Sequence, residues 1–494
     1  MSQRPRIAVI GAGIGGLAAA VELAAKGCDV TVLERGSVPG GKMRELCAGD
    51  AAIDSGPTVF TMRWVFDELF RSAGTNLDDE LSLARADLLA RHAWLDGSRL
   101  DLHADVERSA AAIEAFAGAG EAAAYRRFAA DSEAIYETLA DTFMRREKPN
   151  PVSLGMSLGI GGLPRLYATK PFRTLWSELG RYFDDPRLRQ LFGRYATYTG
   201  SSPFSAPATL MLIAHVERAG VYYVEGGMQR LAEALVRIAK NHGAEFRFST
   251  GAAELRTDRG RVTGVLTESG DELPVDAVVF NGDVDAFGRG LLGKAVARAV
   301  PSRSKEPRSL SAITWSLVAE ADGFPLDHHT VFFGDNYPAE FKALFEASTI
   351  TDMPTVYVCA QDRENAAVPG GPERLFLLVN APARPHRERE LDAAEARVQA
   401  LLSRLGLDLD LGAEDVVRFS PDDFAERFPG TGGAIYGWPT HGMMGSFRRH
   451  GSRSRVRGLY LAGGSVHPGP GVPMTAISGR IAARAVLGDL GRDG

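Results

Sequence analysis

A run of glycines near the start of the chain, Gly11-Ala12-Gly13-Ile14-Gly15-Gly16, has the residue types and spacing that bind a diphosphate. The first glycine of such a motif permits a tight turn, the second lets the backbone reach the pyrophosphate, and the third lets a helix and a strand pack closely. Glu34 follows Gly16 by 18 residues, where a carboxylate can accept hydrogen bonds from a ribose. The motif therefore predicts a dinucleotide site, and the acidic Glu34 argues against a ligand with a 2′-phosphate.

The elements around the motif are those that such a site needs. Residues 6–10 form a short apolar strand, residues 17–27 are strong helix formers, and residues 29–34 form a second apolar strand. Strand, glycine turn, helix and strand is the order of a βαβ unit in a parallel sheet. The alternative, a glycine-rich turn without a ligand, would not need this agreement, and at this point NAD and FAD both remain open.

Length and composition limit the function classes. The chain has 494 residues, which predicts more than one structural unit, and its net charge of −6 makes nucleic acid an unsuitable partner. Its three cysteines form no CxxC pair, so we expect neither disulfides nor a zinc site. His328 and His329 are adjacent, and in a strand they would point to opposite faces, so we expect no metal site. We expect no signal peptide and no spanning helix, which predicts a cytoplasmic protein.

A second glycine pair selects between the two dinucleotides. Glu34-Arg35 is followed after four residues by Gly40-Gly41-Lys42, and Gly56-Pro57-Thr58 comes soon after. This pattern resembles the flavoproteins related to amine oxidases, in which the second glycine loop passes over the diphosphate and the ribityl chain. The resemblance implies FAD as the cofactor. Lys42 stands where the family more often has arginine, and a lysine offers a point charge instead of a planar fork.

The C-terminal residues 459–482, LYLAGGSVHPGPGVPMTAISGRIA, resemble the closing motif of the bacterial carotenoid desaturases, the phytoene desaturase-like branch of these flavoproteins. The resemblance implies that Gly464, Val472, Pro473 and Met474 lie beside the flavin, with a helix N-terminus aimed at the ring. His467, in the same loop, is a candidate catalytic residue. A histidine in a rigid turn is more often structural.

Further matches extend the likeness over most of the chain. Residues 185–192, 223–228 and 252–262 resemble segments of the desaturases, and the last of these implies that the backbone near Ala252 meets the adenine. The sequence VPM at 472–474 and residues 326–333 and 357–362 resemble the hydroxyneurosporene desaturases of purple phototrophic bacteria. This likeness implies insertion of the 3,4 double bond into 1-hydroxyneurosporene, giving demethylspheroidene in spheroidene biosynthesis. Phytoene desaturase, a carotene isomerase, an amine oxidase and a prenyl-binding escort protein without FAD are the alternatives.

A carotenoid substrate has consequences for localisation. Because such a molecule is insoluble in water, we expect it to come from the inner face of the cell membrane or of a photosynthetic membrane, with the protein bound peripherally. Residues 152–176 combine apolar side chains with Arg165, Lys170 and Arg173, which predicts either an interfacial patch or a buried lid. Tyr195, Tyr198 and Phe204 are candidates for the channel wall. A quinone or oxygen is the implied electron acceptor.

We therefore predict an α/β protein with the architecture of the amine oxidase-like flavoproteins. It has a discontinuous Rossmann-like FAD-binding domain, a substrate domain built on a mixed sheet, and a helical cover. The predicted boundaries are 1–90, 220–300 and 451–494 for the FAD-binding domain, 91–219 for the helical and possible membrane-contacting region, and 301–450 for the substrate sheet.

Overall fold

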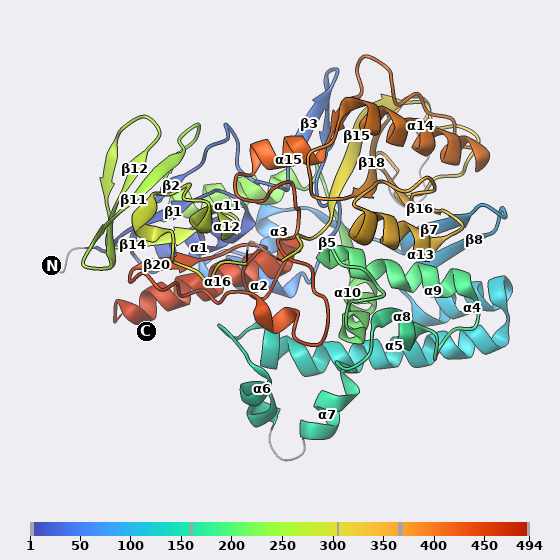
Figure 1. Ribbon diagram of the computed structural model, residues 1–494, viewed down its shortest axis with the longest axis horizontal. Coiled ribbons are helices and arrows are strands. Elements are labelled where there is room, and N and C mark those ends of the chain that lie inside the picture. The colour runs from blue at the N-terminus through green and yellow to red at the C-terminus, as the bar shows by residue number, and fades with distance from the viewer. Residues whose placement is uncertain (1–3, 159–161, 304–305, 364–368, 492–494) are drawn as a thin grey trace.

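The computed structural model describes residues 4–158, 162–303, 306–363 and 369–491 (Figure 1). A five-stranded sheet, parallel throughout, carries the glycine motif. In spatial order its strands are β10 (Glu245–Arg247), β2 (Asp29–Leu33), β1 (Arg6–Ile10), β14 (Ala277–Phe280) and β20 (Leu459–Leu461). These strands come from three separated parts of the chain, so the predicted discontinuous Rossmann-like unit is confirmed.

The two faces of this sheet are covered by different layers. Ile7 and Val9 pack toward a helical layer, whereas Ala8 and Ile10 pack toward a three-stranded meander, as the alternation along a strand requires. The helices are α1 (Ile14–Ala25), α16 (Val472–Asp489), α11 (Gln229–Asn241) and α2 (Trp64–Ser72). The meander consists of β11 (Ala252–Asp258), β12 (Arg261–Thr267) and β13 (Glu272–Pro274).

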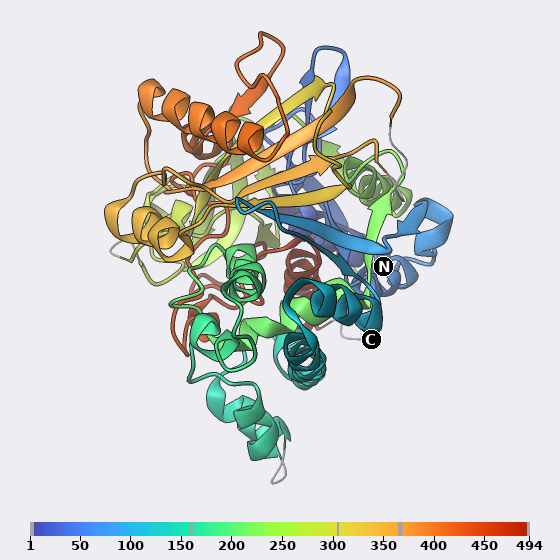
Figure 2. The same ribbon diagram turned by 90° about the vertical axis from the view of Figure 1, so that its right-hand side faces the viewer.

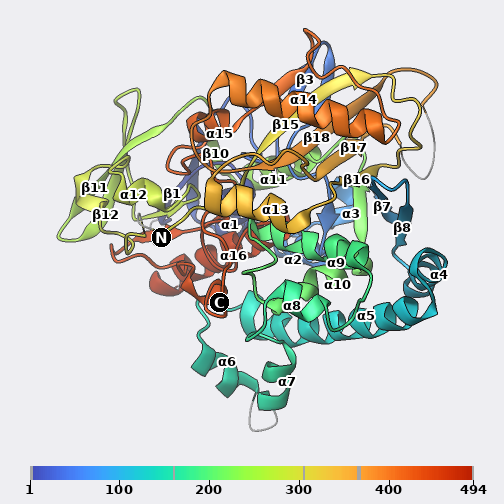
Figure 3. The ribbon, with the colours of Figure 1, turned by 45° about the vertical axis from the view of Figure 1, so that its right-hand side comes forward.

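A second, seven-stranded sheet lies beside the first (Figures 1 and 3). It is mixed because β16 pairs in parallel with β7, while the other pairs are antiparallel. Its order is β19 (Val417–Phe419), β15 (Ser311–Ala319), β18 (Glu373–Ala381), β17 (Val356–Ala360), β16 (His329–Phe333), β7 (Leu88–Trp94) and β8 (Arg99–His103). Helix α14 (Glu388–Arg404) packs on one face through a core that includes Phe332 and Leu401.

The strand β7 crosses residue 90, where the sequence analysis placed a domain boundary. Strand pairing places both β7 and β8 in the seven-stranded sheet, at the far side of β16. Both strands therefore belong with the sheet that the sequence analysis assigned to residues 301–450.

Helices form the layer opposite α14 (Figure 2). The long α5 (Ala119–Leu139) continues into a π-helical turn at Ala140–Met144. The other helices of this layer are α4 (Val106–Ala117), α6 (Pro151–Leu158), α7 (Gly162–Ala168), α8 (Leu175–Leu179), α9 (Pro186–Gly193) and α10 (Leu212–Ala219). Helices α6 and α7 project away from the rest of the molecule in all three views (Figures 1–3).

Short elements connect these layers. The strands are β3 (Glu45–Ala48) with β4 (Ala51–Asp54), and β5 (Phe60–Thr61) with β9 (Val221–Val224) and β6 (Leu83–Arg85). The short helices are α3 (Leu77–Glu80), α12 (Asp285–Gly288), α13 (Tyr337–Lys342) and α15 (Pro421–Arg427), with a π turn at Ala343–Ala347 and 3₁₀ turns at Arg194–Thr199, Ala208–Met211, Lys294–Val296 and Ser446–Arg448. Within the described ranges, none of the helices is both long and apolar enough to cross a membrane.

Candidate functional site

One large cavity of about 1910 Å³ connects the glycine motif with the seven-stranded sheet and the projecting helices. Its wall begins at the carboxyl ends of β1 and β2, which is where ligands bind in open parallel sheets. It continues under the face of the seven-stranded sheet that α14 does not cover and ends at α6 and α7. The volume exceeds the roughly 300–1,000 Å³ of an ordinary ligand pocket, so the cavity has room for more than one bound molecule.

Most residues that the sequence analysis proposed for the cofactor lie on this wall. They are Gly11, Gly13, Ile14, Glu34, Arg35, Gly40, Gly41, Lys42, Gly56, Pro57, Thr58, Ala252, Gly464, Val472, Pro473 and Met474. Gly15 and Gly16 lie behind it. A Cβ on Gly16 would stand 2.0 Å from the Gly11 carbonyl oxygen, and one on Gly15 would stand 2.6 Å from Asn281 Oδ1. These two glycines therefore permit close packing of the helix, as the third glycine of the motif is expected to do.

The two glycine loops pack against each other. The Gly40 N–H donates to the Ala12 carbonyl at 2.9 Å, and a Cβ on Gly41 would lie 3.2 Å from Gly13 Cα. Gly41 also has a φ of +63°, which favours glycine. The loop that follows the acidic residue thus returns to the first loop, which the sequence pattern predicted.

Glu34 is fixed at one end of the cavity by the backbone. Its two carboxylate oxygens accept hydrogen bonds from the N–H groups of Ala12, at 2.6 Å, and Gly36, at 2.7 Å. Each oxygen has a further lone pair, so the carboxylate can still accept the hydroxyls of a ribose.

Two basic side chains line the same cavity. Burial lowers the pKa of Lys42 to about 8, with Arg308 and Arg44 acting in the same direction and Asp283 against them. The Lys42 ammonium donates to the Ile435 carbonyl at 2.5 Å. Burial, with a smaller effect of Arg427, lowers the pKa of Arg44 to about 9, and its guanidinium lies 4.1 Å from the centre of the Phe419 ring. Arg44 Nε and Nη2 are buried without a hydrogen-bond partner among the described residues.

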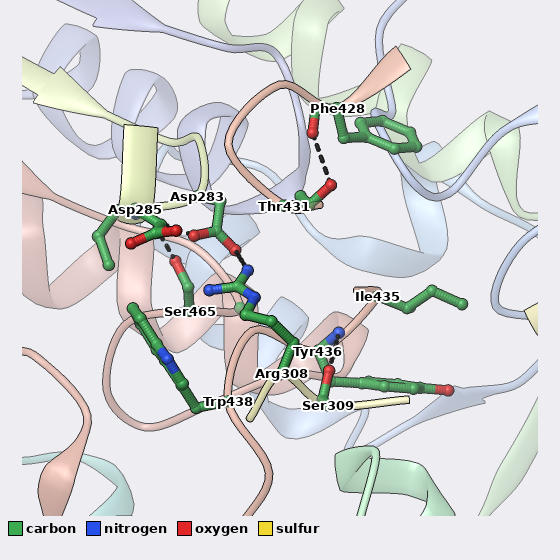
Figure 4. Close-up of polar contacts among 12 residues, drawn as sticks. Asp283, Asp285, Arg308, Ser309, Phe428, Thr431, Ile435, Tyr436, Trp438 and Ser465 are labelled. Atoms are coloured by element: carbon green, nitrogen blue, oxygen red, sulfur yellow. Dashed lines mark hydrogen bonds and ion pairs between the residues drawn. The ribbon is translucent and has the colours of Figure 1, made fainter. Parts of the chain in front are cut away.

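A polar cluster near Ile435, the residue that accepts from Lys42, connects three loops (Figure 4). Arg308 pairs with Asp283 at 2.6 Å, and both side chains are largely buried. The Ser309 hydroxyl accepts from the Tyr436 N–H at 3.1 Å, and the Ser465 hydroxyl accepts from the Val284 N–H at 3.2 Å. These contacts fix the loop around Ile435 that receives Lys42. Sequence reasoning missed this cluster, because its members are distant in sequence and form no motif.

The candidate catalytic residue His467 does not lie on the cavity wall. Its Nε2 is hydrogen-bonded to the Phe143 carbonyl at 2.9 Å, and its ring packs edge-on against Phe143. Burial lowers its pKa to about 4. These contacts make His467 a structural link between the C-terminal loop and the end of α5, the alternative that the sequence analysis also considered.

Of the three aromatic residues proposed for the channel, only Tyr198 reaches the wall. Tyr195 lies behind it and donates to Glu217 Oε2 at 2.7 Å, and Phe204 packs against Trp176. Tyr198 donates to the other oxygen of Glu217 at 2.6 Å and accepts from Arg194 at 3.0 Å. Burial disfavours charge on Arg194, but Tyr198 and Glu217 outweigh this effect and raise its pKa. Arg194 and Glu217 therefore form a buried, charged part of the wall.

The seven-stranded sheet contributes wall residues that the sequence did not indicate, among them His329, Tyr357, Leu378 and Asn380. They come from adjacent strands and point to the same face. The Tyr357 hydroxyl forms hydrogen bonds with Thr58 Oγ1 at 2.6 Å and with His329 Nδ1 at 2.7 Å. The sheet is thereby joined to the Gly56-Pro57-Thr58 segment.

The expectation that His328 and His329 point to opposite faces was wrong. Their ring centres lie 4.6 Å apart, because His328 precedes β16, which begins at His329. A ligand atom from each of them lies within 4.8 Å of Cys359 Sγ. Burial lowers the pKa of both imidazoles and raises that of the Cys359 thiol to about 12, so the thiol is protonated at neutral pH. The three side chains lie close together, and the absence of a metal site stays a prediction.

A comparison with protein families agrees with this geometry. The family described as flavin containing amine oxidoreductase matches residues 14–487. The chain belongs to this family. Relatives within it include a hydroxyneurosporene desaturase of Rubrivivax gelatinosus, 48% identical over 98% of this chain and 94% of its own length. The hydroxyneurosporene desaturase of Cereibacter sphaeroides is 45% identical over 98% of both chains. A 1-hydroxycarotenoid 3,4-desaturase of a Flavobacterium is 31% identical over 96% of this chain and 97% of its own.

Solved structures of two amine-oxidising enzymes share the fold. Putrescine oxidase bound to putrescine has a TM-score of 0.60 and covers 99% of this chain and 100% of its own, with 14% identity. Cyclohexylamine oxidase from Brevibacterium oxydans has a TM-score of 0.58 with the same coverage and identity. At this identity the likeness concerns the fold, which confirms the predicted amine oxidase-like architecture.

FAD is the cofactor of this family member, and the residues present fit it. Two helices, α1 and α16, begin at the cavity wall with Gly13 and Gly471 as N-caps, and within the described chain neither has a side-chain cap. Their first N–H groups are therefore available to an anion or to an electron-rich ring. Arg44, with its unpaired nitrogens, offers charge to a diphosphate, and Glu34 suits the adenosine ribose. The individual contacts with FAD stay a prediction.

Proposed function

We propose that this chain is an FAD-dependent desaturase that introduces the 3,4 double bond into 1-hydroxyneurosporene. The observation that carries the proposal is the identity of 48% and 45%, over nearly the whole chain, with enzymes named hydroxyneurosporene desaturase. The cavity supports it, because its volume accommodates a dinucleotide together with a long apolar molecule.

The wall beyond the glycine loops suits a polyene. Apolar side chains from the sheet, from α5, from α10 and from the projecting helices line it, including Val331, Phe376, Leu378, Leu139, Phe143, Ile213, Val216, Leu154 and Leu166. Such a surface excludes water and holds an extended hydrocarbon in one orientation.

Desaturation removes a hydride and a proton from two adjacent carbons, of which C4 is allylic. Bound FAD supplies the hydride acceptor. The protein has to place the CH–CH unit in register with the cofactor and to exclude water while charge develops in the polyene. Hydrogen bonds join Thr58 to Tyr357 and Tyr357 to His329, and they fix the wall next to the Gly56-Pro57-Thr58 segment. This is the part of the wall where we expect the CH–CH unit to be aligned with the cofactor.

The alternatives are less well supported. Phytoene desaturases are among the relatives, but those of Fusarium fujikuroi and Myxococcus xanthus are 31% and 32% identical to this chain. An amine oxidase is supported by the shared fold alone. An escort protein without FAD would not require two intact glycine loops or Glu34.

We also propose that α6 and α7 dock on a membrane and admit the substrate. Val152, Met156, Tyr167 and Phe172 are 70–74% exposed, which does not fit the buried lid that the sequence analysis left open. Pro151, Leu154, Pro164 and Leu166 from the same helices line the cavity, so its entrance lies in the projecting region. Residues 159–161, between the helices, lie outside the described part. The range 152–176, predicted as an interfacial patch, also contains Lys170 and Trp176. Lys170 pairs with Asp131 and Glu178, and Trp176 packs inward against Phe204, so these two side chains do not add to the exposed patch.

The test is an anaerobic incubation of FAD-loaded protein in liposomes, with 1-hydroxyneurosporene and separately with phytoene. We expect bleaching of the flavin absorbance and one additional conjugated double bond only with the hydroxylated substrate. Reaction with phytoene alone would keep the carotenoid desaturase assignment and exclude the 3,4-desaturase. No reaction with either substrate, although FAD is bound, would overturn the proposal.

A further inference from the structure

His329, a residue of the cavity wall, has an imidazole nitrogen with no hydrogen-bond partner in the described structure. His329 is 4% exposed, and its Nε2 atom is buried without a hydrogen-bond partner among the residues described. Its side chain lies on the cavity face of β16. Val331, two residues later on the same strand, lies on the same face and also lines the cavity. A buried polar atom without a partner is unfavourable and rare in native proteins, so a bound molecule is the natural source of the missing hydrogen bond.

The ring is held in place by its other nitrogen. Nδ1 forms a hydrogen bond with the Tyr357 hydroxyl, which in turn bonds to Thr58 Oγ1. Thr58 follows Gly56-Pro57, on the part of the wall expected to contact the cofactor. His329 is therefore two hydrogen bonds away from that segment.

We propose that His329 Nε2 binds the tertiary hydroxyl group of the substrate, and that this contact makes the enzyme selective for 1-hydroxycarotenoids. The inference rests on the proposed function. In a 1-hydroxycarotenoid the hydroxyl is on C1 and the bond to be oxidised joins C3 to C4, so the two are separated by a single carbon. A group that binds this hydroxyl has to stand beside the reacting carbons, and the hydrogen bonds through Tyr357 hold His329 near the segment expected to contact the cofactor.

The protonation state of His329 agrees with a neutral partner. Burial lowers its pKa well below the usual value, and the nearby charges of His328 and Arg194 act in the same direction. The imidazole is neutral at physiological pH, and the hydrogen bond to Tyr357 is compatible with either tautomer. Nε2 is then either a donor or an acceptor, and a hydroxyl group can pair with both. Arg194, whose charge helps to lower the pKa of His329, disfavours an ammonium group.

Other polar groups on the wall fit this role less well. Glu217, whose oxygens accept the hydroxyls of Tyr195 and Tyr198, lies on α10 and is not part of the hydrogen-bond chain from Thr58. The Thr314 hydroxyl is also buried and unpaired in the described structure, but it lies on β15, and β18 and β17 separate that strand from β16. It is not joined to Thr58 by the hydrogen-bond chain that positions His329.

The experiment measures kcat/KM for 1-hydroxyneurosporene and for its analogue with hydrogen in place of the hydroxyl. Binding of each carotenoid to FAD-loaded protein in detergent micelles is measured separately by its absorption shift. His329→Phe removes both ring nitrogens and keeps an aromatic side chain, whereas His329→Gln keeps a donor and an acceptor near Nε2. We expect His329→Phe to lower the preference for the hydroxylated carotenoid by about 10- to 100-fold in both measurements, and His329→Gln to restore part of it.

Two matched variants serve as controls. His92→Phe is the same change at another buried histidine with an unpaired Nε2 in the described structure, on β7 and away from the cavity wall. Thr314→Val removes the unpaired hydroxyl on β15. We expect both to keep the preference of the unaltered enzyme.

The outcomes separate this inference from the function on which it rests. If the unaltered enzyme does not desaturate the hydroxylated carotenoid, the proposed function fails first. If it does, and His329→Phe binds FAD but keeps the full preference, the hydroxyl contact is wrong. An equal loss of kcat on both carotenoids, with binding preference unchanged, would assign His329 to the chemical step and would also overturn the proposal. A loss of preference in Thr314→Val instead would place the hydroxyl elsewhere.

Discussion

Lys42 is the residue through which pH should act on cofactor binding. Its ammonium has a pKa lowered to about 8, mainly by burial, whereas a lysine in water titrates near 10.5. Below pH 8 the side chain is charged and attracts the diphosphate of FAD, and above pH 8 that attraction is lost. We therefore expect FAD to bind about tenfold more weakly at pH 9 than at pH 7, at low salt.

The measurement is a titration of apoprotein with FAD, followed by flavin fluorescence between pH 6.5 and 9.5. Lys42→Met should bind FAD weakly and show little pH dependence below pH 8.5, where Arg44, with a pKa of about 9, keeps most of its charge. Lys342→Met, on the exposed face of α13 and off the cavity wall, is the matched control and should behave as the unaltered protein. A pH dependence that persists in Lys42→Met would assign the titration to another group.

The sequence predicted those parts of the site that depend on short-range contacts. Gly16 lies against the Gly11 carbonyl, and Gly41 lies against Gly13. A side chain at either position would be too close to the backbone, so the glycines themselves indicate these contacts. The strands β1 and β2 and the helix between them lie where the pattern placed them. Arg44 was visible only as a basic residue after the second glycine pair, because its burial depends on Phe419 and Phe424 of distant elements.

At the scale of the elements, the wall formed by the sheet could not be predicted. His329, Tyr357 and Asn380 belong to three strands, and only strand pairing brings them to one face. The sequence shows no spacing that would identify these three residues as neighbours on the cavity wall, because their proximity depends on how the strands pair. The error at His328 has a similar origin, because the start of a strand is not defined by the sequence to within one residue, and one residue decides the face. Tyr195 was expected on the wall for its aromatic ring, but its hydroxyl binds Glu217 behind it.

Helices α6 and α7 are the elements by which membrane association can be tested. Val152 and Met156 are four residues apart on α6, on one side of the helix, and both are exposed. Their burial in lipid would favour binding, so Val152→Asp combined with Met156→Asp should lower binding to anionic liposomes by at least tenfold. Sedimentation with liposomes measures this binding. Leu291→Asp, at another exposed apolar side chain outside α6 and α7, should leave binding unchanged, and equal losses in both proteins would contradict docking through these helices.

At the scale of the whole molecule, one cavity is lined by three layers of the structure. Its wall runs from Ile10 to Thr475 and takes residues from the parallel sheet, the mixed sheet and the helical layer. Without FAD, the charges of Lys42 and Arg44 are held in a largely buried place with few partners, which is unfavourable. A ligand that spans this wall connects the layers and offsets that cost.

We therefore expect removal of FAD to destabilise the entire molecule and not one domain alone. A ligand at 100 times its Kd stabilises the folded state by about 2.7 kcal/mol, so the unfolding temperature should rise continuously with FAD concentration. Differential scanning calorimetry of apoprotein with increasing FAD measures this rise. Riboflavin, which has no diphosphate for the helix N-termini and the basic side chains, should give a much smaller shift at the same concentration. Equal shifts with the two molecules would show that the diphosphate contacts contribute little, and a shift confined to one of two separate transitions would show that FAD stabilises a single layer.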